Sequence, residues 1–255
     1  KLLNLRKSIE EKFSLIYYIY YLPCLFKNIE YFQKMKFSRS KLKKTLKIEK
    51  LLFIYNTIKD IKKINILEFG VRAGISTNMF LDVCERNSGN LLSVDTDECG
   101  NLFKNKRWKF LKSRDDNFLF IKKHIKKKID VIYIDSLHEP NHVKKILYYY
   151  YKFLKKDGYV FIDDICWLPY VKSSYRVNEF NEIINRRTFN KIIEIYFQNL
   201  KNINLEFSFN ASGTAKLTKK NNKKLNEPKK IYNSEFGLKN IFRNVLKKGL
   251  NKDQL

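Results

Sequence analysis

The chain has 255 residues and a formal net charge of +26, from 52 Lys and Arg against 26 Asp and Glu. This length is enough to bury the core of one large domain with extensions. The four cysteines are scattered and form no C-x-x-C pair, so they indicate neither a zinc site nor a disulfide framework and favour a reducing, cytoplasmic location. The charge has two interpretations: a polyanion or anionic membrane as partner, or an AT-rich codon bias toward Lys, Asn, Ile and Tyr. The scarcity of Arg favours codon bias.

Residues 1–63 are rich in Lys and large apolar side chains and predict a helical N-terminal extension or lid. Within them, residues 13–26 form an apolar run that Pro23 interrupts, too short for a membrane-spanning helix. No small-residue cleavage site follows, so we expect no signal peptide. Three interpretations of this run remain open: a helix packed on the core, a substrate lid, or an interfacial membrane anchor. A second helix, over about 40–62, leads into the first strand.

From residue 64 the chain alternates between strands and helices. We expect strands at 64–69, 91–95, 108–112, 131–135 and 159–164, and helices at 75–86, 117–127, 141–154 and 174–196. This alternation predicts a parallel sheet with right-handed crossovers. Two more strands, 205–209 and 214–217, flank a turn at 210–213, so a hairpin makes the last strand antiparallel. Residues 64–218 therefore predict a Rossmann-like, doubly wound, mostly parallel seven-stranded domain.

The C-terminal region, residues 219–255, separates from this domain by composition. Residues 219–233 are rich in Lys and Asn and predict a solvated linker. Residues 236–250 alternate apolar and basic side chains and predict an amphipathic helix. This helix either docks on the core or lies on an anionic membrane.

The first strand ends in a glycine-containing turn that precedes a helix. Gly70 and Gly74 allow backbone angles or close approaches that other residues do not, and Ser76 or Thr77 can cap the helix. Arg72 stands where a dinucleotide-binding turn has its middle glycine, which argues against NAD or FAD. A nucleoside ligand without a pyrophosphate is compatible with this turn.

Acidic residues end four of the first five strands: Glu68, Asp95, Asp135, and the pair Asp163–Asp164. Ligands of open parallel sheets bind at this edge, and a carboxylate that ends the second strand suits the two hydroxyls of a ribose. Carboxylates at neighbouring strand ends repel one another unless a hard cation joins them, so Asp135, Asp163 and Asp164 predict a Mg²⁺ site. The alternative is that Asp163 and Asp164 form only a turn and a cap.

These acids, the turn from Glu68 to Ser76, the segment from Ile134 to His138 and the segment from Phe161 to Asp164 resemble class I S-adenosylmethionine-dependent methyltransferases. Within that superfamily, residues 60–220 resemble the Mg²⁺-dependent small-molecule and sugar O-methyltransferases, the catechol O-methyltransferase-like group. The resemblance implies a cofactor site made of Glu68, Gly70, Val71, Gly74, Ser76, Asp95, Ser113 and Asp116. Asp115 is the alternative to Asp116 beside the adenine. The resemblance also implies Asp135, Asp163 and Asp164 as metal ligands.

His138 follows Asp135 by three residues, on the loop where relatives keep a general base, so we expect His138 and Asp135 to be the catalytic residues. A neutral imidazole suits proton transfer near pH 7. The alternative is a local hydrogen bond from His138 to Glu139 or Asn141. Some sugar-specific relatives place an acid where this chain has Leu137. We expect His142 to be exposed and His124 to lie on the surface.

The resemblance implies O-methylation of a small hydroxylated acceptor, such as a sugar or glycan precursor, with Mg²⁺ assistance. No Asn-Pro-Pro-Tyr-type motif follows the fourth strand, which argues against transfer to amines. Two alternatives remain open. The positive charge is compatible with an RNA methyltransferase, and residues 13–26 with the basic tail are compatible with a catalytically silent membrane or complex partner. We expect a cytoplasmic protein, with peripheral membrane contact through its termini as the alternative.

Overall fold

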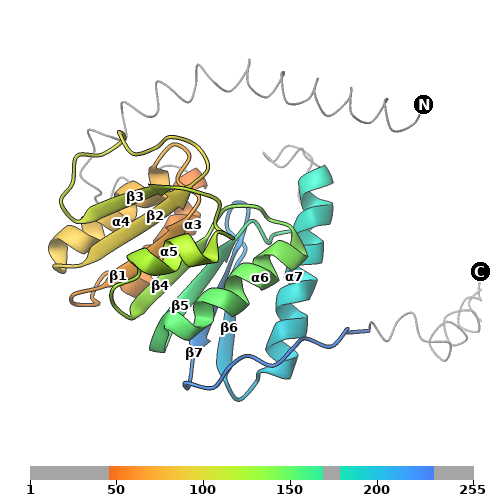
Figure 1. Cartoon of the computed structure of the whole chain (residues 1–255). Helices are drawn as coiled ribbons and strands as arrows, with labels where there is room; N and C mark the ends of the chain where they lie inside the picture. Colours follow the sequence, from red (N-terminus) through yellow and green to blue (C-terminus); the bar gives the residue numbers. More distant parts are fainter. Residues whose placement is uncertain (1–45, 169–178, 233–255) are drawn as a thin grey trace, which may run out of the picture.

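The computed structural model describes residues 46–168 and 179–232. The predictions for residues 13–26 and 236–250 lie outside these ranges. The described residues form a seven-stranded sheet with helices on both faces (Figure 1). The strand order is β3-β2-β1-β4-β5-β7-β6. The order reverses between β1 and β4, which is the position where open sheets of this kind bind their ligands.

The first five strands are parallel, and the sixth and seventh form a hairpin at one edge. They are β1 (Asn65–Phe69), β2 (Asn90–Asp95), β3 (Trp108–Lys112), β4 (Ile129–Ile134), β5 (Leu154–Asp163), β6 (Ile203–Ser208) and β7 (Thr214–Lys219). β7 is antiparallel to both β5 and β6. The predicted mostly parallel sheet with an antiparallel last strand is therefore confirmed. β5 begins at Leu154, earlier than predicted, because residues 155–158 form an irregularity in the register against β4 and do not end the strand.

Five α-helices and one 3₁₀ turn lie in the described part of the chain. They are α3 (Leu46–Ile58), α4 (Ile75–Arg86), α5 (Phe118–His124), α6 (Pro140–Tyr150), η1 (Tyr151–Phe153) and α7 (Glu179–Gln198). None of these helices combines the length and the apolarity that crossing a bilayer requires.

The sheet separates two apolar clusters because successive strand residues point to opposite faces. Leu67, Ile132 and Ile162 belong to the cluster that includes residues of α5, α6 and α7. Ile66 and Val131 belong to the cluster that includes residues of α3 and α4. Both faces of the central strands are thus covered, which explains their continuous apolar sequences.

The segment after β7 returns across the helices instead of projecting into solvent (Figure 1). Leu225 packs against the core cluster. The amide of Asn226 donates to Asn199 Oδ1 at 2.8 Å, and the hydroxyl of Tyr148 donates to the Asn226 carbonyl oxygen. Lys219, the last residue of β7, is only 3% exposed. Lys219 therefore belongs to the sheet, whereas most of residues 220–232 are exposed and contact the domain at Leu225 and Asn226.

Candidate functional site

The turn after β1 passes so close to the end of β4 that only glycine fits at its first position. Gly70 has φ +96°, and a Cβ there would lie 2.1 Å from the main-chain oxygen of Asp135. Gly74 is the N-cap of α4 and has φ +74°. The turn therefore brings the β1 and β4 ends together, which places Asp135 beside it.

Glu68 lies beneath this turn and is fully buried. Its carboxylate accepts hydrogen bonds from the hydroxyls of Ser76 at 2.6 Å, Thr77 at 2.8 Å and Ser93 at 2.6 Å. The predicted capping by Ser76 or Thr77 is wrong, because α4 has no side-chain cap and both hydroxyls point to Glu68 instead. Burial raises the pKa of Glu68 to about 7, although the three hydroxyl donors act in the opposite direction.

Asp95, at the end of β2, holds the other side of the turn. Its Oδ2 accepts the amide hydrogens of Val71 at 2.6 Å and Arg72 at 2.9 Å, and its Oδ1 accepts that of Asp97 at 3.0 Å. These bonds fix the orientation of the carboxylate at the edge of the sheet. The Thr96 hydroxyl lies 3.5 Å from Oδ1, a long contact that a better placed donor can replace.

The two acids after β3 have different environments. Asp115 is buried, and its Oδ2 lies 2.5 Å from the donor hydroxyl of Ser136 and 2.8 Å from Nε2 of His142. Asp116 instead pairs with Arg114 and Lys145 at the surface, and the hydrogen bond from Arg114 lowers its pKa well below the usual range. The structure thus places Asp115, not Asp116, against the loop and helix that follow β4. It also shows that His142 is largely buried rather than exposed.

Three predicted residues meet where β4 and β5 end. Nε2 of His138 lies 3.5 Å from Oδ1 of Asp135 and 3.3 Å from Oδ2 of Asp164. One potential ligand atom from each lies within 4.8 Å of the others. The His138 carbonyl oxygen accepts a 2.6 Å hydrogen bond from Thr188 on α7, so a neighbouring helix holds this loop. Each of the three side chains is about one-quarter to one-third exposed, which leaves them accessible to a ligand.

Asp163 does not join this group, although it precedes Asp164 in the sequence. It is fully buried and forms an ion pair with Lys50 of α3, and it also accepts hydrogen bonds from Tyr133 and Thr214. Burial alone would raise the pKa of Asp163, but Lys50 outweighs it and lowers the pKa. Burial similarly opposes the charge of Lys50, and the surrounding carboxylates reverse that effect and raise its pKa.

Asp135 retains uncompensated negative charge in its surroundings. Burial first, and then the carboxylate of Asp163, raise the pKa of Asp135 well above its usual range, while Lys50 acts against this rise. A cation at the exposed side would relieve the repulsion between Asp135 and Asp164.

A cavity of about 520 Å³ connects these groups at the carboxyl edge of the sheet. Of the predicted site residues, its lining includes Gly70, Val71, Asp95, Ser113, Asp135, His138 and Asp164. Glu68, Gly74, Ser76, Asp116 and Asp163 are not part of that lining. The predicted set therefore divides into residues that face the cavity and residues that support it from behind or lie outside it.

Known proteins share both the sequence pattern and the fold of this region. Residues 67–165 match the family model described as a methyltransferase domain. This part of the chain is therefore similar to a methyltransferase domain. The match spans the turn after β1, the carboxyl ends of the first five strands and all the residues that line the cavity. Comparison with curated protein sequences finds no match.

Solved methyltransferase structures share the fold of this domain. MycE methyltransferase of the mycinamycin biosynthetic pathway, in complex with Mg and SAH, aligns with a TM-score of 0.53 and 16% identity over 69% of this chain and 51% of its own. This chain therefore spans about half the length of MycE. A putative caffeoyl-CoA O-methyltransferase from Staphylococcus aureus aligns with a TM-score of 0.52 and 16% identity over 83% of this chain and 99% of its own. SAH-bound PaMTH1 from Podospora anserina aligns with a TM-score of 0.52 and 14% identity, over 77% of this chain and 88% of its own.

Sequence reasoning missed three of the residues that shape this site: Lys50, Ser136 and His142. A signal existed for Lys50, since it lies four residues before buried Ile54 and so shares the apolar side of α3. His142 lies four residues after His138, but the helix begins only at Pro140, so helical spacing could not relate the two. Ser136 carried no signal beyond its place after Asp135.

Proposed function

We propose that this protein is a Mg²⁺-assisted, S-adenosylmethionine-dependent O-methyltransferase whose acceptor is a small hydroxylated molecule, such as a sugar or glycan precursor. One observation supports this most. A single cavity contains Asp95 at the end of β2 and the group Asp135, His138 and Asp164 at the ends of β4 and β5. A nucleoside site and a proton-transfer or metal site thus open into the same space.

Asp95 would hold the ribose of the cofactor. Its orientation is fixed by the amides of Val71 and Arg72, and Oδ1 can accept from a ribose hydroxyl. Ser113 and Asp115 border the same cavity at the end of β3, where the adenine would lie. Glu68 and Ser76 would act from behind by holding the turn in shape.

The residues present are compatible with Mg²⁺. Asp135 and Asp164 line the cavity, and Mg²⁺ accepts two carboxylates when waters and substrate oxygens complete its coordination. Asp163 is committed to Lys50, so we assign it the role of holding Tyr133 and Lys50 beneath the site. A divalent cation bound there would supply a Lewis acid that lowers the pKa of the acceptor hydroxyl.

His138 is the candidate general base. Its Nε2 lies between Asp135 and Asp164, and Thr188 holds its main chain in place. In this assignment Nε2 accepts the proton of the acceptor hydroxyl, and the two carboxylates stabilise the resulting imidazolium. S-adenosylmethionine supplies an electrophilic methyl group on a sulfonium, so alignment of the acceptor is the main task of the protein.

Calorimetry with S-adenosylhomocysteine tests the cofactor site. We expect binding by the wild-type chain and a loss of about ten- to hundredfold for Asp95→Ala, as for a hydrogen bond to a charged group. Asp60→Ala, which removes an exposed carboxylate after α3, is the control and should bind like the wild type. No binding at high micromolar concentration, or equal binding by Asp95→Ala, contradicts the proposal.

A methyl-transfer screen over glycans, catechols and RNA, with and without EDTA, tests the acceptor and the metal. Transfer to a hydroxylated small molecule that EDTA abolishes and added Mg²⁺ restores is the expected result. Transfer that EDTA does not affect excludes the metal role, and transfer only to RNA excludes the proposed acceptor class.

A further inference from the structure

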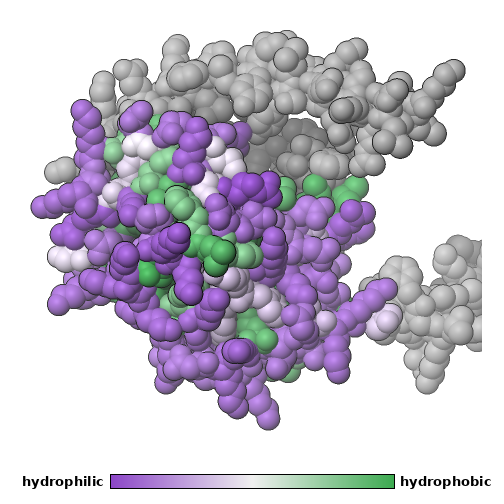
Figure 2. Space-filling view, in the orientation of Figure 1, coloured by the Kyte–Doolittle hydropathy of each residue, from purple (hydrophilic) through white to green (hydrophobic). Residues whose placement is uncertain are grey.

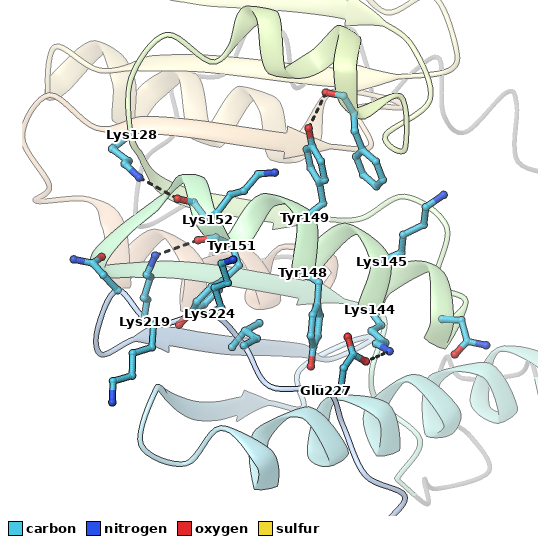
Figure 3. A pocket seen from close by; sticks show the side chains of 15 residues that line it. Lys128, Lys144, Lys145, Tyr148, Tyr149, Tyr151, Lys152, Lys219, Lys224 and Glu227 are labelled. Atoms are coloured by element: carbon cyan, nitrogen blue, oxygen red, sulfur yellow. Dashed lines mark hydrogen bonds and ion pairs between the residues drawn. The ribbon is translucent and has the colours of Figure 1, made fainter.

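A second and larger cavity, of about 970 Å³, lies on the face of the domain that carries α6 and η1 (Figure 3). Residues 219–227, which return after β7, form part of its wall. Seven lysines line it, against a single acid, Glu227. The surrounding face is largely hydrophilic (Figure 2). We call this cavity the lysine groove.

The lysines of the groove are mostly without carboxylate partners. Lys144 pairs with Glu227, and Lys145 pairs with Asp116 at 3.2 Å. Within residues 46–168 and 179–232, the other five form no ion pair with an acid. Most described lysines outside the groove also lack an ion pair, and Lys155, which pairs with Asp130 at 2.6 Å, is an exception; the groove differs because seven lysines line one hollow. The groove therefore concentrates positive charge that the described part of the protein does not neutralise.

At the end of the groove formed by η1 and β7, main-chain oxygens accept hydrogen bonds from two of the lysines (Figure 3). Lys128 donates to the carbonyl oxygen of Lys152 at 3.0 Å. Lys219 donates to the carbonyl oxygens of Tyr151 at 3.2 Å and Leu154 at 2.8 Å. Burial, and then the charge of Lys128, lower the pKa of Lys219. Carbonyl dipoles orient these ammonium groups but leave their formal charges unbalanced, so an anion would stabilise this end.

Aromatic rings complete the wall. Phe118 and Tyr149 stack with centroids 3.9 Å apart, and the ammonium of Lys152 lies 3.8 Å from the centroid of the Tyr149 ring. Tyr148 lines the groove beside Lys144. A flexible polyanion that also carries planar rings would place its negative charges on the lysines and its rings beside the aromatic side chains.

We propose that the lysine groove binds single-stranded nucleic acid through its phosphodiester backbone. The binding is independent of sequence, because lysines contact phosphates as point charges and no arginine lines the groove for bidentate base contacts. This inference goes beyond the proposed methyl transfer and does not require the nucleic acid to be the acceptor.

The test is fluorescence anisotropy of the full chain with labelled 12-nucleotide oligouridine and oligothymidine over a series of salt concentrations. The test variant carries Lys128→Gln, Lys152→Gln and Lys224→Gln. The control variant removes the same charge from exposed lysines near β1 and β3, as Lys63→Gln, Lys104→Gln and Lys106→Gln. Three lost phosphate contacts reduce the slope of log K against log salt by about 2, since each contributes about 0.7 for a single strand.

We expect at least tenfold weaker binding by the test variant, with the control variant close to the wild type and both folded by circular dichroism. Equal losses by the two variants would show that binding follows overall charge and would overturn the proposal. Tighter binding of polyphosphate, an acidic peptide or vesicles containing phosphatidylserine than of either oligonucleotide would overturn it as well. If calorimetry shows no binding of S-adenosylhomocysteine, the methyltransferase proposal is contradicted, but the proposal for the lysine groove is not affected.

Discussion

The buried carboxylate of Glu68 makes a quantitative prediction about stability and pH. Its pKa is about 7 in the folded protein, against an ordinary value of 4.5 for a solvated Glu. Between these values the unfolded chain releases the proton while the folded chain retains it, so stability falls as pH rises. The difference of about 2.5 between the two pKa values corresponds to about 3 kcal/mol in the free energy of unfolding. This contribution is present at low pH and is lost as the pH rises above 7. Glu68→Gln cannot ionise and should remove this contribution.

Urea unfolding at pH 4.5, 5.5, 6.5 and 7.5 measures the effect. The free energy of unfolding of the wild type minus that of Glu68→Gln should decrease by about 3 kcal/mol across this range. Glu85→Gln, which removes an exposed carboxylate from α4, controls for the loss of a charge as such. A difference that stays constant or increases with pH would refute the reasoning. It would mean that the hydroxyls of Ser76, Thr77 and Ser93 keep Glu68 ionised despite its burial.

Three further perturbations follow from the site. Gly70→Ala should destabilise the protein by more than about 3 kcal/mol in urea unfolding, because its Cβ would overlap the main chain of Asp135 at a positive φ. Lys50→Met should cost about 3–5 kcal/mol in the same assay, because it leaves Asp163 charged and buried without a partner. Asp115→Ala should weaken S-adenosylhomocysteine binding by about tenfold in calorimetry, because this acid lines the cavity beside the end of β3.

Each of these three substitutions has a control variant. Gly100→Ala should cost less than about 1 kcal/mol, because its Cβ would meet only the movable end of Glu98 and the edge of a ring. Adding Asp163→Asn to Lys50→Met should recover part of the lost stability, since it removes the unpaired charge; purely additive losses would argue against the ion pair. Asp116→Ala should bind S-adenosylhomocysteine more tightly than Asp115→Ala does. The reverse order would indicate that Asp116, not Asp115, contacts the cofactor.

The sequence by itself determined the parallel sheet and the edge at which ligands bind. Continuous apolar runs that end in acids identify buried strands. Because parallel strands end at one edge, Asp95 and Asp135 had to lie on the same side of the sheet. Helix α4 and strand β3 have the bounds that periodicity predicts, since both are governed by local spacing of apolar side chains.

Only the tertiary structure decided which side chains pair. Lys50 and Asp163 are 113 residues apart, and packing of α3 on the sheet brings them together. Asp115 and Asp116 have the same chemistry in sequence, but the backbone after β3 turns one inward and the other to the surface. Local patterns report which face of an element is buried, whereas the partner of each polar group depends on elements distant in the chain.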